Sequence, residues 1–484
     1  MNQTHAPRDA AIRHSFVSTA DYRIRYWMVL LAMLVAVLLY LDRICLSTAS
    51  ASVERDLGLS SDKLKWVLSA FFWTYALAQL PAGWLGDRYG ARWVLASYVA
   101  LWSLSTALLG VAAGVTSLLV LRLACGLFEA GAYPVCAGIV RRWIPAAHRG
   151  LASGIVSVGG RLGGALAPVL TIELMLLWST SYSDGATSPE AGPADWSWRP
   201  VMFLYGGIGI VVAGVFAWLY RDSPRDHPLV TERELAIISQ GEPAANTTAE
   251  ITTSNTVSDA HSISSERKPS DNVLPIRGLL TSSSLWLMSY VQFASNFGWA
   301  FLVTLMPRYL SDVHHVSQQT QGWMQSLSLG AGIAGLLIGG RLTDVATRIW
   351  GLRYGRASLL FLSRVLVALA FLGCLAVRNP LEATLCLALV GFATDLGIGA
   401  TWAYGQDVGG RHVGVVMGWA NMWGNFGAAL SPIAFDLISK AFALDLPRGW
   451  QFAFLICAAV QALAAIAALG VSAHRSLDGQ RVVN

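Results

Sequence analysis

The feature that most constrains this chain is a series of apolar segments, each long enough to cross the roughly 30 Å hydrocarbon core of a membrane as a helix. Of its 484 residues, 54% are hydrophobic and only 13% are charged, whereas soluble domains carry about 25% charged residues. The chain is therefore predicted to be an all-α membrane protein with twelve transmembrane helices. These spans are expected at residues 26–48, 64–85, 92–112, 115–140, 149–178 and 200–220, and then at 284–310, 320–343, 357–377, 381–407, 412–439 and 450–472.

The basic residues between the spans predict the orientation, because Lys and Arg accumulate on the cytoplasmic side of a membrane. With both termini in the cytoplasm, that side carries about 22 of the 34 Lys and Arg residues, against about 8 on the other side. We therefore expect a multi-pass protein of the inner (plasma) membrane, and we attribute the net charge of +5 to this topology rather than to nucleic-acid binding.

The predicted domain organisation follows from the spacing of the spans. The first apolar run ends in Asp42 and Arg43, so we expect an uncleaved span there rather than a signal peptide. Between the sixth and seventh spans lies a polar stretch rich in Ser and Thr, which predicts disorder. The predicted parts are a cytoplasmic tail at 1–25, a six-helix bundle at 26–220, a partly disordered cytoplasmic linker at 221–279, a second six-helix bundle at 280–474 and a cytoplasmic tail at 475–484.

The two predicted bundles repeat each other. Gly83 and Asp87 end the second span with the same spacing that separates Gly340 from Asp344 at the end of the eighth. Spans 5 and 11 match at four positions that lie 264 residues apart. The matching residues are Gly150, Gly154, Gly163 and Pro168 in span 5, and Gly414, Gly418, Gly427 and Pro432 in span 11. Two six-helix bundles related by an internal repeat are the expected frame for alternating access, with a solute held between them.

Four charged side chains lie inside the apolar segments of the first half. Asp42 and Arg43 belong to span 1, and Arg122 and Glu129 belong to span 4. A charge at bilayer depth costs at least about 2.5–3.5 kcal/mol, so we expect these residues to bind a charged solute and to carry protons. The alternative is that they only hold spans 1 and 4 together.

The helical spacing of these four residues predicts how they pair. Arg122 and Glu129 are seven residues apart, which places them on one face about 10 Å apart along the axis, too far for a direct bond. Asp42 and Arg43 are neighbours and point about 100° apart. We therefore expect pairs between the helices, either Asp42 with Arg122 or Arg43 with Glu129.

Two further charged residues lie near the middle of the membrane. Arg161 is in span 5, and the repeat offset of 264 residues maps it onto Asn425 in span 11. Added to the charges of spans 1 and 4, it leaves one excess positive charge when Asp42 and Glu129 are ionised and three when both are protonated. This balance predicts an anion site in which protonation frees arginines for a carboxylate. Asp395, in span 10, is expected to pair with an arginine or to carry a proton.

Other polar and aromatic residues are predicted to contact the solute or to gate its passage. For the solute contacts, the alternative is an interhelical hydrogen bond or an aromatic core position. These expected contacts are Tyr40, Tyr75, Asn421, Asn425, Thr401 and Trp402. The predicted gating residues, which would form latches where glycines let helices approach closely, are Asp87, Arg88, Arg92 and Asp344. Arg364 is expected to extend its side chain to the cytoplasmic surface.

Several stretches resemble the major facilitator superfamily. GWLGDRYGAR after span 2 resembles its best-known loop motif, and GGRLTDVATR resembles the second-half copy of that motif. More narrowly, the chain resembles the anion:cation symporter branch, which includes hexuronate, galactonate and glucarate transporters. The stretches that carry this narrower resemblance are YLDR at 40–43, FFWTYALAQLPAGW at 71–84, RLACGLFEAGAYP at 122–134 and SPRDHPLVTERELAII at 223–238.

The resemblance implies proton-coupled import of organic anions, and the charges of spans 1 and 4 match the functional charges of the branch. Some sugar-acid members carry a polar amide in the middle of span 5, where this chain has Gly160 and Arg161. We therefore expect its specificity to depart from theirs at this position.

The sequence-based prediction is a proton-coupled symporter for a small organic anion, with a sugar acid (a hexuronate, aldonate or aldarate) as the first candidate. One alternative is an organic-phosphate or phosphate exchanger, because paired arginines also suit phosphate. A less favoured alternative is a sensor that binds solute without moving it. An enzyme is not expected, because the sequence contains no nucleophile–base pair, metal cluster or phosphate loop. We expect a monomer in the lipid bilayer, with the proton as coupling ion, no other cofactor or metal, and no nucleic-acid partner.

Overall fold

The computed structural model describes residues 23–182, 195–240, 274–442, 445–473 and 477. Within these residues the secondary structure is helical, with no strand. Most of the predicted tails and much of the linker that is predicted to be disordered lie outside the described residues.

Helices occupy every predicted span of the N-terminal half, here residues 23–240. The short helix α2 (Ser50–Leu57), which the sequence analysis did not predict, follows the first span. The fourth span consists of two consecutive helices, α5 and α6. The helices of the six spans are α1 (Ile24–Thr48), α3 (Ser61–Tyr89), α4 (Ala91–Leu109), α5 (Val115–Glu129) with α6 (Ala132–Trp143), α7 (Arg149–Tyr182) and α8 (Trp198–Leu219).

The C-terminal half, here residues 274–477, is less regular. The seventh span runs through α12 (Ser283–Ala300), a π-helical turn η6 (Phe301–Leu305) and α13 (Met306–His314). Spans 8 and 9 are the two helices of α14 (Gln318–Gly373), which meet at a kink at Gly351, whose φ of 74° lies in the left-handed region that favours glycine. The remaining helices are α15 (Pro380–Leu396), α16 (Ile398–Gly409), α17 (Val413–Ala441) and α18 (Leu446–Leu469), with the short α9 (Glu232–Ile238) and α11 (Ile276–Thr281) before them in the chain.

The described helices account for twelve spans. Eight continuous segments are long and apolar enough to cross a membrane. Two of these segments, 320–373 and 380–441, each contain two consecutive spans. The second span (α3) and the seventh (α12 to α13) complete the set, so the predicted all-α fold is confirmed.

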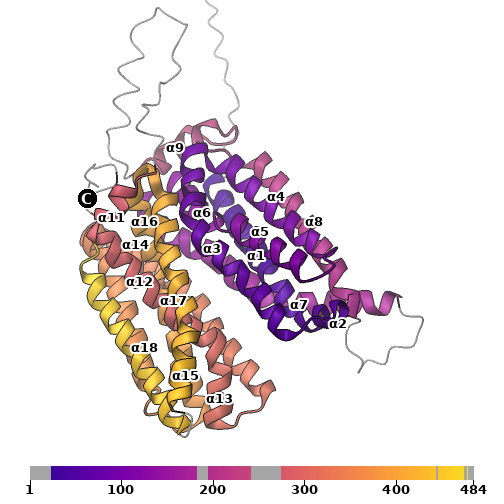
Figure 1. The fold of residues 1–484 in the computed structure, drawn as a ribbon. Coiled ribbons are helices and arrows are strands. Elements are labelled where there is room, and N and C mark those ends of the chain that lie inside the picture. Colours follow the sequence, from indigo (N-terminus) through magenta and orange to yellow (C-terminus); the bar gives the residue numbers. More distant parts are fainter. Residues whose placement is uncertain (1–22, 183–194, 241–273, 443–444, 474–476, 478–484) are drawn as a thin grey trace, which may run out of the picture.

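The two halves pack in corresponding ways, as an internal repeat requires. Spans 1 and 5 pack together as α1 on α7, and spans 7 and 11 do the same as α12 on α17. Spans 3 and 6 pack as α4 on α8, and spans 9 and 12 as the second part of α14 on α18. Between the halves, α3 packs on α17 and α7 packs on α14, which joins the two bundles side by side (Figure 1).

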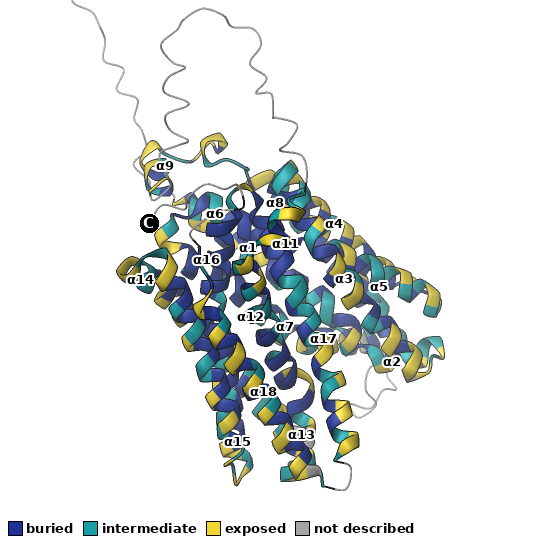
Figure 2. Ribbon diagram, turned by 60° about the vertical axis from the view of Figure 1, so that its left-hand side comes forward, coloured by how far each residue is buried: buried dark blue, intermediate teal, exposed yellow. Residues whose placement is uncertain are grey.

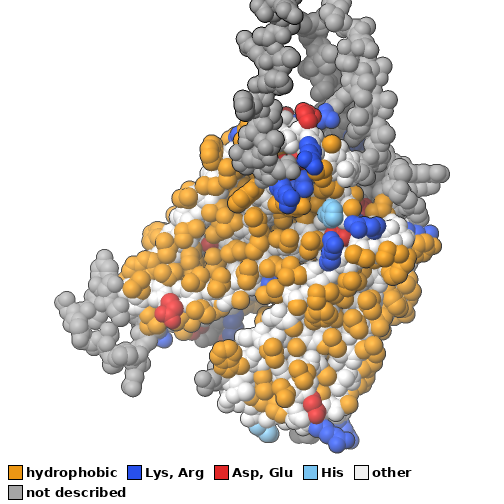
Figure 3. All heavy atoms as spheres, turned by 180° about the vertical axis from the view of Figure 1, so that it is seen from behind, with side chains coloured by type: hydrophobic (Ala, Val, Ile, Leu, Met, Phe, Trp, Pro, Cys, Tyr) orange, Lys and Arg blue, Asp and Glu red, His pale blue; other side chains and the backbone are white. Residues whose placement is uncertain are grey.

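The outer surface suits a lipid environment. Buried residues lie where helices face one another, and exposed residues run along the outside (Figure 2). Many of the exposed residues are large and apolar, including Trp66, Trp218 and Trp323, which are all more than 70% exposed. Hydrophobic side chains cover most of both halves in Figure 3, and Lys and Arg side chains gather toward the ends. This pattern is expected of helices whose outer faces contact acyl chains.

The two halves meet at one end of the molecule, which we call the closed end. It contains the start of α1, whose Ile24 N–H donates to Glu234 of α9, and the start of α7 and α17. At the opposite end, the space-filling outline is hollowed between the halves (Figure 3). Both described ends of the chain lie at the closed end (Figure 1).

Candidate functional site

Arg43 and Glu129 form an ion pair between the first and fourth spans. Arg43, on α1, donates from Nε (3.1 Å) and Nη2 (3.0 Å) to the same oxygen, Oε2, of Glu129 at the end of α5. The Glu129 side chain is 1% exposed and the Arg43 side chain 13% exposed, so the guanidinium keeps some access to solvent. This is one of the two pairs between helices that the sequence analysis considered.

Aromatic rings surround the Arg43 guanidinium. Its Cζ lies 4.3 Å from the ring centroid of Tyr75, 4.9 Å from that of Phe71 and 5.1 Å from that of Tyr40. Cation–π attraction to these rings stabilises a charge that water cannot fully solvate at this depth. Tyr40 and Tyr75, two of the predicted solute contacts, therefore lie beside the arginine predicted to bind the anion.

Asp42 does not pair with Arg122, so that predicted alternative is wrong. Its Oδ2 accepts hydrogen bonds from Trp102 Nε1 (3.0 Å) and Ser103 Oγ (3.4 Å) on α4, while its Oδ1 has no partner among the described residues. The physical reason is the turn of about 100° between consecutive helix residues, which directs Asp42 toward α4 while Arg43 faces α5. A buried carboxyl with one unpartnered oxygen is chemically suited to accept a proton.

Arg122 is 2% exposed and lies behind Arg43. Its Nη2 donates to the backbone oxygen of Arg43 at 3.5 Å, and its Cζ stacks 4.8 Å from the ring centroid of Phe71. Its Nε and Nη1 have no hydrogen-bond partner within the described part of the chain. An arginine keeps its charge in proteins, so these unpartnered donors favour the approach of an acceptor.

Arg161 and Asp395 form a second ion pair, which joins the two halves. Arg161 of α7 donates from Nε (2.9 Å) to one oxygen of Asp395 on α15 and from Nη2 (2.6 Å) to the other. The Arg161 Cζ also lies 5.1 Å from the ring centroid of Trp299. The sequence analysis treated Arg161 as a free anion binder, and in this conformation its guanidinium is instead occupied by a carboxylate of the protein.

The other four predicted solute contacts lie in different surroundings. Thr401 Oγ1 donates to the carbonyl oxygen of Gly397 (3.1 Å), so its hydroxyl is hydrogen-bonded to the backbone one helical turn earlier. Trp402 is 6% exposed and packs edge-on against Tyr133, with ring centroids 5.6 Å apart. Asn421 and Asn425 are half-buried on α17, where Asn425 Nδ2 donates to the Asn421 carbonyl (2.8 Å). Of these, the two asparagines keep amide groups that a solute could contact.

Asp87, a predicted gating residue, joins the halves at the closed end. Its two oxygens accept hydrogen bonds from the backbone N–H groups of Gly414 and Val415, each at 2.9 Å, at the start of α17. A carboxylate here satisfies two of the free N–H groups of the helix and complements its dipole. The approach is close because Gly83 faces Gly414, and a Cβ on Gly83 would collide with the Gly414 carbonyl.

Asp344 makes the equivalent contact from the other half. Its oxygens accept hydrogen bonds from the N–H groups of Gly150 (2.8 Å) and Leu151 (3.0 Å) at the start of α7. The donating N–H groups of the two contacts are related by the repeat, because Gly150 and Leu151 lie 264 residues before Gly414 and Val415. We call the two contacts the carboxylate latches.

Arg92 and Arg364 do not behave as predicted. Arg92 Nε donates to the carbonyl oxygen of Ala217 (2.7 Å), and its backbone N–H to Asp222, so these contacts hold it within the N-terminal half rather than across the gate. Arg88 stacks on Trp84, 5.0 Å from its ring centroid. Arg364 is 2% exposed, so the prediction that it reaches the cytoplasmic surface is wrong. The carbonyl oxygen of Thr394 and other groups inside the C-terminal half accept its hydrogen bonds, which removes the need to reach water.

The sequence analysis missed a further ion cluster between the halves. Asp407 of α16 contacts Arg356 Nε at 3.1 Å and Arg149 Nη1 at 3.6 Å. Arg149 belongs to the N-terminal half, and the other two residues belong to the C-terminal half. Arg356 and Arg149 each lie at the boundary of a predicted span, where a basic residue indicates only the orientation of the chain in the membrane. The signal that the sequence offered was the position of an acidic residue, Asp407, at the end of predicted span 10.

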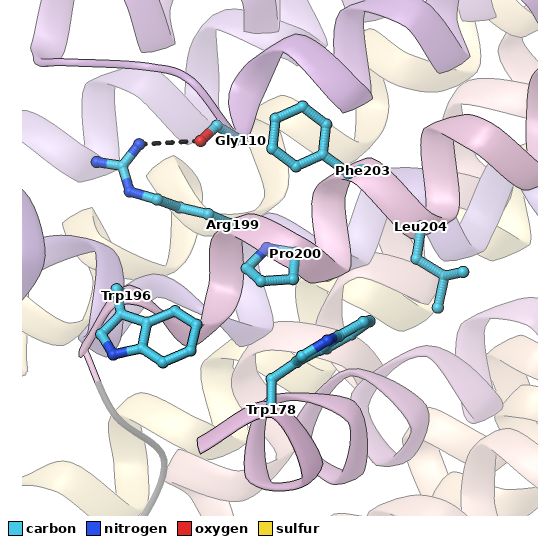
Figure 4. Close-up of a pocket in the computed structure, with 7 residues that line it drawn as sticks. All are labelled: Gly110, Trp178, Trp196, Arg199, Pro200, Phe203 and Leu204. Atoms are coloured by element: carbon cyan, nitrogen blue, oxygen red, sulfur yellow. Dashed lines mark hydrogen bonds between the residues drawn. The ribbon is translucent and has the colours of Figure 1, made fainter. Parts of the chain in front are cut away.

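A cavity of about 570 Å³ lies away from these charges, at the ends of α7 and α8. It is lined mainly by apolar and aromatic side chains, including Trp178, Trp196 and Phe203 (Figure 4). Arg199 is the charged residue in its lining, and its guanidinium is already bound to the Gly110 carbonyl (2.9 Å) and to Asp56. The cavity therefore does not offer a free cation to an anionic solute.

The family model of the Major Facilitator Superfamily matches residues 32–432, which is most of the chain. This protein belongs to the Major Facilitator Superfamily. It is therefore a membrane transporter and not an enzyme, and its two helical bundles are the two halves of the superfamily fold.

Among transporters of this superfamily, the chain is similar to proteins named for organic acids. It is 28% identical over 444 residues to a probable sulfoacetate transporter of Cupriavidus necator, covering 91% of this chain and 92% of that protein. It is 30% identical over 426 residues to a probable galactarate/D-glucarate transporter of Escherichia coli (strain K12), covering 86% and 87%. A D-galactonate transporter of Escherichia coli is 26% identical, covering 87% and 90%.

Solved structures support the superfamily fold at lower identity. The proton:xylose symporter XylE aligns with a TM-score of 0.65 and 14% identity, covering 91% of this chain and 94% of that one. The transporter FucP, in an outward conformation, aligns with a TM-score of 0.61 and 15% identity, covering 90% and 97%.

Substitution of a latch carboxylate in this transporter is expected to loosen the closed end. In Asp344→Asn the amide can accept from one backbone N–H but not from both, which costs about 1–2 kcal/mol, a factor of roughly 5–30 in the closed population. Hydrogen–deuterium exchange should rise at Gly150 and Leu151, and Asp87→Asn should have the same effect at the start of α17. Asp312→Asn, at the other end of the molecule, is the control. Unchanged exchange in both latch variants would contradict the role of the latches.

Proposed function

We propose that this chain is a proton-coupled symporter that imports a small organic anion, with sugar acids as the first candidate class. The observation that carries the proposal is the Arg43–Glu129 pair, in which an acid already occupies the arginine best placed to bind an anion. A solute carboxylate would compete with Glu129 for the same guanidinium. Proton coupling follows from this competition.

The proposed cycle begins with protonation of Glu129. A protonated carboxyl no longer balances the Arg43 charge, and a buried charge without a partner is costly. A carboxylate of the solute then replaces Glu129 on Arg43 with two charge-assisted hydrogen bonds. When the proton leaves on the other side of the membrane, Glu129 forms its ion pair with Arg43 again and displaces the solute. Proton and anion therefore move in the same direction.

Asp42 is proposed as a second proton carrier. It is 1% exposed, and its Oδ1 lacks a partner among the described residues. Asp42 precedes Arg43 on α1 and interacts electrostatically with Glu129, so a change of charge on Asp42 alters the field at the anion site. No cofactor other than the proton is needed.

The orientation of the cycle rests on the predicted topology. If the termini are cytoplasmic, the closed end faces the cytoplasm and the hollow between the halves faces the outside of the inner membrane. Release would then require the two carboxylate latches to open. The names of the similar transporters, which include galactarate, D-glucarate, galactonate and sulfoacetate, support the anion class.

The test is uptake by purified protein in liposomes. We expect labelled galactarate, galactonate or sulfoacetate to accumulate when the outside is more acidic than the inside, and to stop accumulating when an ionophore removes the pH gradient. Exchange of phosphate or organic phosphates that is independent of the gradient would contradict the proposal and favour a phosphate exchanger instead.

A further inference from the structure

The Arg161–Asp395 pair differs from the pair at Arg43 in the helices that it joins, and resembles it in its access to solvent. It joins the halves, from α7 to α15, rather than two helices of one half. Like the Arg43–Glu129 pair, it has unequal access to solvent, because the Arg161 side chain is 18% exposed and the Asp395 side chain 3% exposed. The arginine is therefore the member of the pair that a solute can reach.

Asp395 lies between two arginines, one from each half. Arg161 binds both of its oxygens. Arg364 lies behind it in the C-terminal half, where Arg364 Nη2 donates to the carbonyl of the adjacent Thr394 (3.0 Å). Arg364 is 2% exposed, and its Nε has no partner in the described part of the structure. On the remaining side Asp395 meets the backbone of α14 at Gly332, which has no side chain to bond with it.

The charges of this cluster do not balance. Arg161 is paired with Asp395, and Arg364 interacts electrostatically with the same carboxylate, which leaves one net positive charge in a buried region. If Arg161 turned away, Asp395 would keep Arg364 beside it, with an unpartnered Nε available. The cluster can thus release Arg161 to another anion without leaving a buried acid unpaired.

Arg161 and Arg43 both interact with Tyr40. The Arg43 Cζ is 5.1 Å from the Tyr40 ring centroid. On α7, Gly160 packs so closely against Tyr40 and the Tyr133 hydroxyl that a Cβ there would collide with both. Arg161, the next residue, points about 100° from Gly160 and reaches α15. Its guanidinium still interacts electrostatically with Tyr40 and Tyr133, and Tyr133 interacts in the same way with Arg43. The two cations, one from α1 and one from α7, therefore lie around the same pair of tyrosines.

We propose that Arg161 binds a second acidic group of the solute, so that the carried class is small dianions with a carboxylate or sulfonate at each end. This inference rests on the proposed function, in which Arg43 binds the first acidic group. Asp395 occupies Arg161 in the empty transporter and moves to Arg364 when the solute arrives. Galactarate, D-glucarate and sulfoacetate, which name two of the similar transporters, each carry two acidic groups. Aldonates and hexuronates carry one and would leave Arg161 with Asp395.

The position of the pair also ties solute binding to the movement of the halves. On α7, Gly150, Gly154 and Arg161 are four and seven residues apart, so they share one helix face. Gly150 and Gly154 approach the backbone of α14, at Gly340 and Leu336, and Arg161 reaches α15. Opening of the closed end separates this face from the C-terminal half. A solute that replaces Asp395 on Arg161 removes the ion pair that would otherwise oppose that separation.

The test compares dianions with monoanions in liposomes. We expect the wild-type protein to take up galactarate or sulfoacetate with a kcat/KM roughly ten- to hundredfold above that for galactonate, and Arg161→Gln to bring this ratio close to one while galactonate uptake persists. Asp395→Asn removes the resident competitor and should lower KM for the dianion. Arg199→Gln, which breaks an ion pair within one half, is the matched control and should leave the ratio unchanged.

The outcomes separate the two proposals. Equal uptake of both classes by the wild type, or an unchanged ratio in Arg161→Gln, would overturn the dianion inference alone. A structural role of the pair would lower uptake of all solutes equally, and so would leave the ratio unchanged. Absence of any organic-anion uptake by the wild type would overturn the proposed function itself. If Arg161→Gln does not fold, as judged by its melting in detergent, Arg161→Lys provides the same readout, because it keeps the charge but loses the two-pronged contact.

Discussion

Glu129→Gln is expected to abolish accumulation of the anion against its gradient while leaving exchange of internal for external anion intact. Glutamine is neutral at every pH, so it resembles the protonated glutamate and leaves Arg43 available to the solute. The binding step therefore survives, but position 129 releases no proton on the other side, and a proton on Asp42 does not displace the solute from Arg43. With one coupled proton, a pH difference of one unit supports an accumulation of up to about tenfold in the wild type. In the variant, the ratio of internal to external anion should stay near one.

The measurement is paired uptake and counterflow in liposomes that contain the same amount of protein. Glu173→Gln is the control, because Glu173 is an exposed carboxyl of α7 in the same half. Full accumulation by Glu129→Gln would show that Glu129 does not carry the coupled proton and would direct attention to Asp42. Loss of counterflow as well would mean that Glu129 is needed to bind or move the solute itself.

Arg43→Gln is expected to abolish uptake, mainly because the solute no longer binds. The substitution removes two charge-assisted hydrogen bonds to the solute and leaves Glu129 as a buried acid without its partner, a change that costs about 3–5 kcal/mol. In affinity this corresponds to roughly 10²–10³-fold or more. Arg43→Lys keeps the charge but lacks the planar fork and stacks less well on Tyr40, Phe71 and Tyr75, so we expect an intermediate loss.

The affinity of both variants for galactarate would be measured by thermal-shift titration, and their transport by initial uptake rates. Arg308→Gln removes an exposed guanidinium and serves as the control, since its charge lies outside the site. Wild-type affinity in Arg43→Gln would contradict the role of Arg43. Equal loss in the lysine and glutamine variants would show that geometry, not charge, decides binding at this position.

Most of the fold could be predicted from the sequence. Each span is an apolar run whose length matches the membrane, and each half repeats glycines at the same spacing, so both features are local properties of the chain. The short helix α2 was not predicted because its sequence, SASVERDL, is as polar as a loop between two spans. The π-helical turn η6 was not predicted because it is as apolar as the span that contains it. The separation of spans 8 and 9 agrees with the structure, where two helices meet at a kink at Gly351 within α14.

The pairing of the charges was only partly predictable. Arg43 with Glu129 was one of two options that helix geometry allowed, and the structure contains it. The Asp42 alternative failed because hydropathy does not reveal which neighbour a helix face meets, and Asp42 meets Trp102 on α4. Arg161 and Asp395 were each identified as unusual, but their contact depends on how the two halves dock.

The sequence by itself determined that the chain spans a membrane twelve times, that its halves repeat, and which charges lie at bilayer depth. These properties follow from hydropathy and spacing along single helices. Only the tertiary structure decided that Asp395 occupies Arg161, that Arg364 lies behind them, and that Asp87 and Asp344 cap helices of the opposite half. The physical reason is that the contacts of Arg161, Asp87 and Asp344 join residues about 200 to 330 positions apart, whose distances are set by the packing of one half against the other. Arg364 reaches the neighbour of Asp395 across two packed helices, α14 and α15.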